Sequence, residues 1–193
     1  MDTIMLISSS PRRQELLRNS GFTFRAAPSG IDEVLHETED PRDAVLRIAH
    51  EKMSYFLKKD QILGCNLALA ADTFVHVSGK NFGKPCNREQ AEEYLRTLSG
   101  RVHQVYTGMV LFSRKTNQRL DCVELTDVRF APLADEDIEW YLDSGEWQNA
   151  AGAYKVQGRA QCLIESVRGS FSSVMGLPMH RLYEMLRILG YQP

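Results

Sequence analysis

The sequence lacks long hydrophobic runs. None of its apolar stretches approaches the roughly eighteen residues that a membrane-spanning helix needs. The apolar segment at residues 4–7 follows an acidic residue and precedes two arginines, which is the wrong charge order for a secretory signal peptide. These absences predict a soluble, cytoplasmic protein with no membrane partner.

Cysteine and histidine are sparse and poorly spaced for metal binding. The 193 residues include four cysteines with no C-x-x-C pair, and five histidines with no H-x-x-x-H pair. We therefore expect free thiols and no structural zinc site.

A strong net charge of either sign is also missing. The chain has 23 Lys and Arg against 25 Asp and Glu, a formal net charge of −2. This balance excludes the broad basic surface with which proteins hold duplex nucleic acid, so any anionic ligand must meet a local group of cations. No low-complexity tract or internal repeat interrupts the sequence, which favours a single bilobed domain over residues 1–193.

Strand-like and helix-like patterns alternate along the chain and predict an α/β fold. Strands are expected over residues 3–7, 67–71, 102–112, 120–130 and 163–167. Helices are expected over residues 11–19, 88–98 and 135–144, and two more begin near residues 40 and 178. We expect the acidic helix at 135–144 to present a solvated face, because its sequence contains no basic residue.

Three serines and two arginines surround the start of the first predicted helix. Ser8 follows the first strand, and Arg12 and Arg13 lie in the first helical turn. The helix dipole places partial positive charge there, so two arginines are unfavourable unless an anion binds. Free backbone N–H groups and guanidinium groups suit a phosphate. The alternative is a solvated arginine pair beside a serine cap.

Two carboxylates and a lysine form a second set of candidates. Asp72 directly follows the strand predicted over 67–71, where a ligand crevice forms in α/β sheets, and is a candidate base or metal ligand. Its alternative role is to cap the turn at Thr73. Lys52 lies on the apolar stripe of its helix, which predicts a buried anionic partner. Glu33 could be that partner, a metal ligand or an ordinary loop acid.

Glycine-rich segments supply two further candidates. Lys84 follows a glycine turn and could offer a point charge to phosphate, although a solvated lysine is the default. Gln157 lies in a glycine-rich tract that suggests close backbone approach, and its amide could hydrogen-bond the edge of a base.

Nine short motifs, in order along nearly the whole chain, resemble the Maf family of nucleoside triphosphate pyrophosphatases. They are LISSSPRRQELL at residues 6–17, IDE at 31–33, ADT at 71–73, GKP at 83–85, SGRVH at 99–103, TG at 107–108, SGEW at 144–147, AGAYKVQG at 151–158 and VMGLP at 174–178. The Ala-Asp-Thr form is similar to the branch that acts on dTTP and UTP. Ile7 departs from the family's usual alanine.

The resemblance implies an α/β fold with a mixed twisted sheet and two lobes around a central cleft, similar to inosine triphosphate pyrophosphatases. It implies an enzyme, often a homodimer, that uses a divalent cation, Mg²⁺ or Mn²⁺, to hydrolyse a nucleoside triphosphate to the monophosphate and pyrophosphate. By position in the motifs, Asp72 matches the catalytic carboxylate and, with Glu33, a metal ligand. The matching substrate-binding residues are Ser8, Arg12, Arg13, Lys52, Thr73, Lys84 and Gln157.

The sequence leaves two alternative functions open. The first is a nucleotide-binding regulator of cell division or septum formation, in which hydrolysis is incidental. The second is a pyrophosphatase for other modified nucleotides, such as 7-methyl-GTP. A carboxylate beside several phosphate-binding cations favours the enzyme, since a binding module needs no such base. The resemblance to the dTTP and UTP branch implies dTTP, UTP and modified pyrimidine nucleotides as substrates.

Overall fold

The computed structural model describes residues 2–34, 39–59 and 64–191. Its internal contacts divide the chain into two compact units. The first unit comprises residues 1–72, 107–124 and 176–193, and the second comprises residues 73–106 and 125–175. Within the described residues, seven strands pair in the order β2-β1-β3-β5-β6-β7, with β4 on β3. The predicted fold class, α/β with a mixed sheet, is confirmed.

The first unit is built around parallel strands. Strand β1 (Ile4–Ile7) pairs in parallel with β2 (Phe24–Ala27) on one side and with β3 (Leu67–Val77) on the other. Helices α1 (Pro11–Asn19), α2 (Pro41–Lys58) and α6 (Met179–Ile188) complete it, together with parts of β5 (Val102–Ser113) and β6 (Gln118–Phe130).

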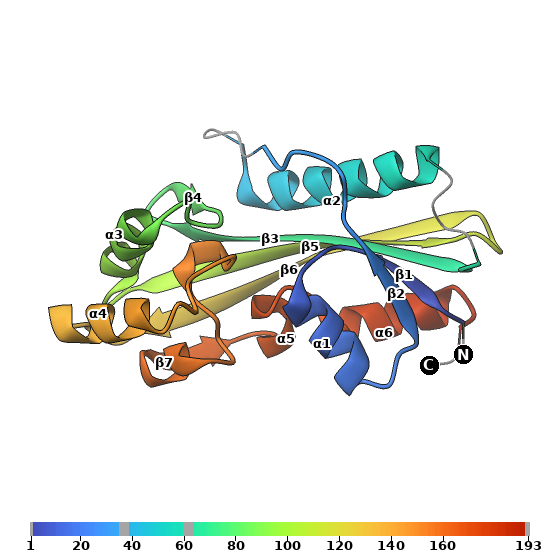
Figure 1. Ribbon diagram of the computed structural model, residues 1–193. Coiled ribbons are helices and arrows are strands. Elements are labelled where there is room, and N and C mark those ends of the chain that lie inside the picture. The colour runs from blue at the N-terminus through green and yellow to red at the C-terminus, as the bar shows by residue number, and fades with distance from the viewer. Residues whose placement is uncertain (1, 35–38, 60–63, 192–193) are drawn as a thin grey trace. The chain divides into compact units, whose positions relative to one another are not determined.

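Both faces of the first unit's sheet are buried, by helices on opposite sides (Figure 1). Alternate residues of β1 and β3 point to opposite faces, as strand geometry requires. Ile4 and Leu6 join a core cluster with residues of α1 and α6, whereas Met5 and Ile7 join one with residues of α2. This arrangement explains the continuous apolar runs of these strands.

The second unit contains two antiparallel strand pairings. Strand β4 (Lys80–Phe82) pairs with the end of β3, and β7 (Ile164–Arg168) pairs with β6. Its helices are α3 (Arg88–Leu98), α4 (Asp135–Asp143) and the short α5 (Phe171–Val174), with 3-10 turns at Ala151–Ala153 and Arg159–Cys162. The rings of His103, Phe130 and Tyr154 meet edge to face, with centroids 5.0–5.4 Å apart.

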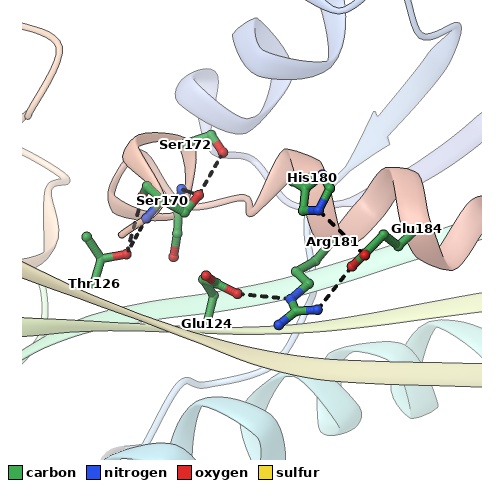
Figure 2. Close-up of polar contacts among 8 residues, drawn as sticks. Glu124, Thr126, Ser170, Ser172, His180, Arg181 and Glu184 are labelled. Carbon is green, nitrogen blue, oxygen red and sulfur yellow. Dashed lines mark hydrogen bonds and ion pairs between the residues drawn. The ribbon is translucent and has the colours of Figure 1, made fainter. Parts of the chain in front are cut away.

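Two polar groups in Figure 2 tie strand β6 to neighbouring elements. In the first unit, Arg181 of α6 bonds Glu124 of β6 at 3.2 Å and Glu184 at 3.0 Å. In the second unit, Thr126 of β6 accepts a hydrogen bond from the backbone N–H of Ser170, which caps α5. None of these residues is a predicted site residue, and their contacts hold β6 to the segments that follow it.

The structure corrects several element predictions. Strands β2 and β4 were not expected, and β3 extends to Val77 instead of ending before Asp72. The acidic residues of α4 are exposed, as expected of a solvated face, and two of them, Asp135 and Glu139, form surface ion pairs with Arg96 and Arg88 of α3. Within the described ranges, no helix is long and apolar enough to cross a membrane.

Candidate active site

The candidate site of the first unit lies where β1 ends beside β3. The parallel register pairs Leu6 with Leu69; β1 ends one residue later, whereas β3 continues to Val77. Ser8 therefore follows β1, and Asp72 lies in the part of β3 beyond it. Strands β2 and β3 flank β1 on opposite sides, and α1 and α2 lie on opposite faces. This reversal at β1 makes a topological switch point, where α/β sheets bind ligands.

Asp72 is not at the end of its strand, as the sequence analysis expected, but in its middle. The residues after it favour extended structure, because Thr73, Phe74 and Val75 are β-branched or aromatic. The side chain of Asp72 is only 8% exposed. It does not cap a turn at Thr73, because β3 continues through both residues. A buried carboxylate of this kind needs a charged or hydrogen-bonded partner.

Lys52 is that partner. It lies on the buried face of α2, and its side chain is 2% exposed. Its Nζ is 2.6 Å from Asp72 Oδ1, 2.7 Å from Glu33 Oε1 and 3.3 Å from the carbonyl oxygen of Ala71. A lysine ammonium has three N–H donors, one for each of these acceptors. The apolar stripe thus correctly predicted a buried anionic partner, Asp72, and Glu33, whose side chain is 33% exposed, is a second anionic partner.

Arg13 and Ser8 join this group from the start of α1. Arg13 is buried; its Nε donates to the carbonyl oxygen of Gly176 at 2.7 Å, and its Nη1 donates to Ser8 Oγ at 3.1 Å. Burial lowers the pKa of the Arg13 guanidinium, and the nearby carboxylates of Asp72 and Glu33 oppose that shift. The charge of Arg13 therefore interacts with both carboxylates that Lys52 contacts. Arg12, on the same turn, is half-buried.

Sequence reasoning from the residues alone missed one part of this arrangement, the carbonyl of Gly176. This group lies 163 positions from Arg13 in the chain, so no local spacing could connect them. Only the VMGLP motif at 174–178 marked the region. The contact fixes the direction of the Arg13 side chain.

The remaining predicted residues belong to the second unit. Thr73 is half-buried in β3, Lys84 is exposed after β4, and Gln157 is half-buried. The glycine turn before Lys84 is tied to the glycine-rich tract, because Gly152 N–H donates to the Gly83 carbonyl oxygen at 3.0 Å. The Oε1 atom of Gln157 is buried and has no hydrogen-bond partner among the residues that the structure describes. It is an acceptor that a ligand could use.

The backbone after Gln157 is closely held. The N–H of Arg159 donates to Glu146 Oε2 at 2.9 Å, and the Nε2 of Gln161 donates to the carbonyl oxygen of Gln157 at 3.0 Å. A Cβ atom at Gly158 would lie 2.1 Å from Glu146 Oε2. The absence of a side chain at residue 158 lets the Glu146 carboxylate lie against the backbone, which is the close approach that the glycine-rich tract indicated.

The residues suit a magnesium ion in donor type. Glu33 and Asp72 offer carboxylate oxygens that approach one common cation, the Lys52 ammonium. The described ranges contain no group of three or more His, Cys, Asp and Glu side chains that could hold a metal ion. Mg²⁺ does not require such a cage, because it is commonly bound by one or two carboxylates together with substrate phosphates and water.

Comparison with known proteins identifies the family. The family model described as "Maf-like protein" matches residues 3–189. The chain belongs to the Maf family. Maf relatives that match it over nearly their whole length are named dTTP/UTP pyrophosphatase. The protein from Symbiobacterium thermophilum is 44% identical and covers 99% of this chain and 96% of its own length. The protein from Desulforamulus reducens is 40% identical and covers 100% of this chain and 99% of its own length.

Relatives from other bacteria carry the same name. An Escherichia coli protein is 41% identical over 96% of this chain and 92% of its own. Among solved structures, the Staphylococcus aureus Ham1 protein is similar at 11% identity and a TM-score of 0.44, covering 67% of this chain and 72% of that one. The family assignment rests on the sequence matches.

Proposed function

We propose that this Maf protein hydrolyses the pyrimidine nucleotides dTTP and UTP, and modified pyrimidine nucleoside triphosphates, to the monophosphate and pyrophosphate. The names of its full-length relatives support this reaction. The observation that carries the proposal is the buried Asp72 carboxylate, held by Lys52 beside Arg13 at the switch point of the sheet. A buried carboxylate next to cations at such a switch point supports a general base at the ligand-binding position of an α/β sheet.

Asp72 acts as the general base in this proposal. Water attacks the α-phosphorus, the bond from that phosphorus to the bridging oxygen breaks, and pyrophosphate leaves. Asp72 takes the proton from the attacking water. Lys52, which donates to three acceptors, holds the Asp72 carboxylate in one orientation. A general base must be aligned with the water that it deprotonates, so this fixed orientation favours the role.

The negative charge of the triphosphate must be neutralised for this reaction. Arg12, Arg13 and Lys84 are the proposed phosphate-binding cations, with the Ser8 hydroxyl beside Arg13. Lys52 already donates to three acceptors, so it contacts phosphate only if it exchanges one of them when nucleotide binds. We therefore assign Lys52 first to positioning the two carboxylates.

Gln157 and Thr73 are the proposed base-recognition residues. The unpartnered Oε1 of Gln157 is an acceptor, and thymine and uracil carry an N–H donor at N3, whereas N3 of cytosine is itself an acceptor. A buried acceptor left unpaired by the wrong base costs about 1–3 kcal/mol. This favours dTTP and UTP over CTP.

Glu33 and Asp72 are the proposed ligands for a divalent cation, Mg²⁺ or Mn²⁺. Such an ion would neutralise phosphate charge and lower the pKa of bound water. The homodimer implied by the resemblance and the cytoplasmic location stay predictions.

The test is a nucleotide panel. The protein is incubated with dTTP, UTP, CTP, dATP and 7-methyl-GTP in Mg²⁺ or Mn²⁺, and pyrophosphate and orthophosphate are measured separately. We expect pyrophosphate from dTTP and UTP, and loss of turnover by about 10²–10⁴-fold in Asp72→Asn. Asp43→Asn, an exposed aspartate on α2, is the matched control and should retain activity.

Each other outcome points away from the proposal. Tight nucleotide binding without hydrolysis would support the regulator instead. Preferential hydrolysis of 7-methyl-GTP would assign the protein to another substrate branch, and full activity of Asp72→Asn would remove Asp72 as the base.

A further inference from the structure

The segment that carries Glu33 is fastened to helix α2 by an arginine that the sequence analysis did not single out. Arg47 lies on α2, five positions before Lys52. Its Nη2 donates to the backbone carbonyl oxygen of Val34 at 3.0 Å. Because Val34 directly follows Glu33, this hydrogen bond fixes the backbone next to the carboxylate that reaches Lys52.

Arg47 is itself held in place by two carboxylates. Its Nε and Nη2 donate to the two oxygens of Glu39, both at 2.7 Å, in a bidentate pair. Its Nη1 donates to Glu51 Oε1 at 2.9 Å, one helical turn further along α2. A bidentate arginine pair constrains direction as well as distance. The side chains are only partly exposed, 29% for Arg47 and 19% for Glu39.

A second close approach to α2 lies on the other side of Glu33. Gly30 has a φ of +69°, and a Cβ atom there would lie 2.6 Å from the ring of Tyr55, also on α2. The chain therefore runs against α2 at Gly30 and again at Val34. Between these two points, Glu33 contacts Lys52 at 2.7 Å. One helix thus supplies the lysine and, at both points, lies against the segment that brings the second carboxylate.

We propose that Arg47 is a positioning residue for the reaction, which holds the Val34 backbone and so places the Glu33 carboxylate against Lys52. This inference rests on the proposed function, because it assigns Arg47 a role through Glu33. Substitution of Arg47 removes the hydrogen bond to the Val34 backbone beside Glu33. It leaves the side chains of Lys52, Asp72 and Arg13 in place.

The experiment compares Arg47→Ala with Arg42→Ala. Arg42 is an exposed arginine in the first turn of the same helix and is the matched control. We expect Arg47→Ala to lower kcat/KM for UTP by about 10- to 100-fold, as loss of the groups that orient metal ligands does. It should also raise the Mg²⁺ concentration needed for half-maximal rate. Arg42→Ala should change neither.

Arg47→Lys tests the geometry of the pair. Lysine keeps the charge but cannot form the bidentate contact and the Val34 contact together. We expect Arg47→Lys to recover only part of the activity that Arg47→Ala loses, while its urea midpoint of unfolding equals that of the wild type. Full activity of Arg47→Lys would show that a positive charge alone is needed at this position, and would overturn the role of Arg47 as a positioning residue.

A double-mutant cycle with Glu33→Gln decides whether Arg47 acts through Glu33. We expect Arg47→Ala to have no further effect on kcat/KM in the Glu33→Gln background, because the group that it positions is already gone. Independent, additive losses would overturn the proposal.

Amide hydrogen exchange provides a readout that does not depend on turnover. Peptides covering residues 30–34 should exchange faster in Arg47→Ala than in Arg42→Ala, and unchanged exchange would contradict the inference. If the wild-type chain releases no pyrophosphate, the proposed function fails, while the exchange experiment still tests the attachment of this segment.

Discussion

Lys52 Nζ lies 2.6 Å from Asp72 Oδ1, and the two side chains are 2% and 8% exposed. The pair joins α2 to β3 in the first unit, and Glu33 adds a second carboxylate at 2.7 Å from the same nitrogen. Burying a charge costs free energy unless the charge is paired and hydrogen-bonded. Removing one member of this group therefore leaves a buried charge with fewer partners and destabilises the folded protein. The consequences differ for the two partners.

We predict that Lys52→Met destabilises the protein more than Asp72→Asn does. Loss of the lysine leaves the buried Asp72 carboxylate without its counter-ion, which costs about 3–5 kcal/mol. Asp72→Asn leaves Lys52 paired with Glu33, and the new amide oxygen can still accept a hydrogen bond. Urea unfolding at pH 7 measures both free energies.

Lys58→Met is the control for the loss of a lysine from α2, because Lys58 is exposed in the last turn of that helix. It should change the free energy of unfolding by no more than about 0.5 kcal/mol. Equal losses in Lys52→Met and Asp72→Asn would show that Glu33 does not support Lys52 as the geometry indicates.

The sequence was sufficient to predict elements whose ends carry local signals. Pro11 begins α1, and Asn87 caps α3 by accepting a hydrogen bond from Gln90 N–H. The apolar stripe on α2 placed Lys52 on the buried face. The short β2 was missed because it has only four residues and no hydrophobic alternation, being half-buried at its ends and exposed between them.

The candidate site was predictable as a set of residue types but not as a set of contacts. Asp72 was expected at the end of a strand because a charge usually interrupts an apolar run. The strand continues because Lys52, 20 positions earlier, neutralises that charge. Arg47 gave no signal, since its partners Val34 and Glu39 lie 13 and 8 positions before it, outside any helical spacing.

Gly108 of β5 allows the strand to pack against α2. A Cβ atom at this position would lie 2.6 Å from the backbone carbon and oxygen of Val45 and 2.9 Å from the backbone nitrogen of Leu46. Backbone atoms of a packed helix cannot rotate away, so we predict that Gly108→Ala costs about 3 kcal/mol of stability. Chemical denaturation of the variant and the wild type measures this difference.

Gly21→Ala is the comparison for Gly108→Ala. Gly21 has a φ of +76° but open space around it, so its substitution adds backbone strain of about 1–2 kcal/mol without a clash. A loss in Gly108→Ala no greater than in Gly21→Ala would mean that β5 and α2 can move apart at little cost.

Gln157→Leu tests base recognition. Leucine has a similar size but no acceptor, so we predict a fall in kcat/KM for UTP of about ten-fold or more, with little change for CTP. Steady-state kinetics with both nucleotides measures the ratio. Gln148→Leu, at an exposed glutamine in the same unit, is the control. An unchanged UTP to CTP ratio in Gln157→Leu would remove Gln157 from base recognition.

His103 makes the stability of the protein sensitive to acid. It is 1% exposed, and burial lowers its pKa from 6.5 to about 3. Below pH 6.5 the unfolded chain binds a proton at this position that the folded protein does not bind until pH 3. Stability is therefore lost as pH falls through this window, by at most about 1.4 kcal/mol per pH unit, and nothing is lost above it.

We predict that His103→Gln flattens the fall of the unfolding free energy between pH 6 and pH 4, because glutamine does not titrate and its amide can still hydrogen-bond the Tyr154 hydroxyl, which lies 2.8 Å from His103 Nε2. Urea unfolding at several pH values gives the slope for each protein. His180→Gln, at a histidine whose side chain is 80% exposed, is the control for the loss of an imidazole. All three proteins contain the same carboxylates, so the comparison of slopes isolates the effect of the substituted histidine. If the His103→Gln slope equals that of the wild type, the buried imidazole accepts its proton in the folded state, and the burial of His103 does not govern the acid response.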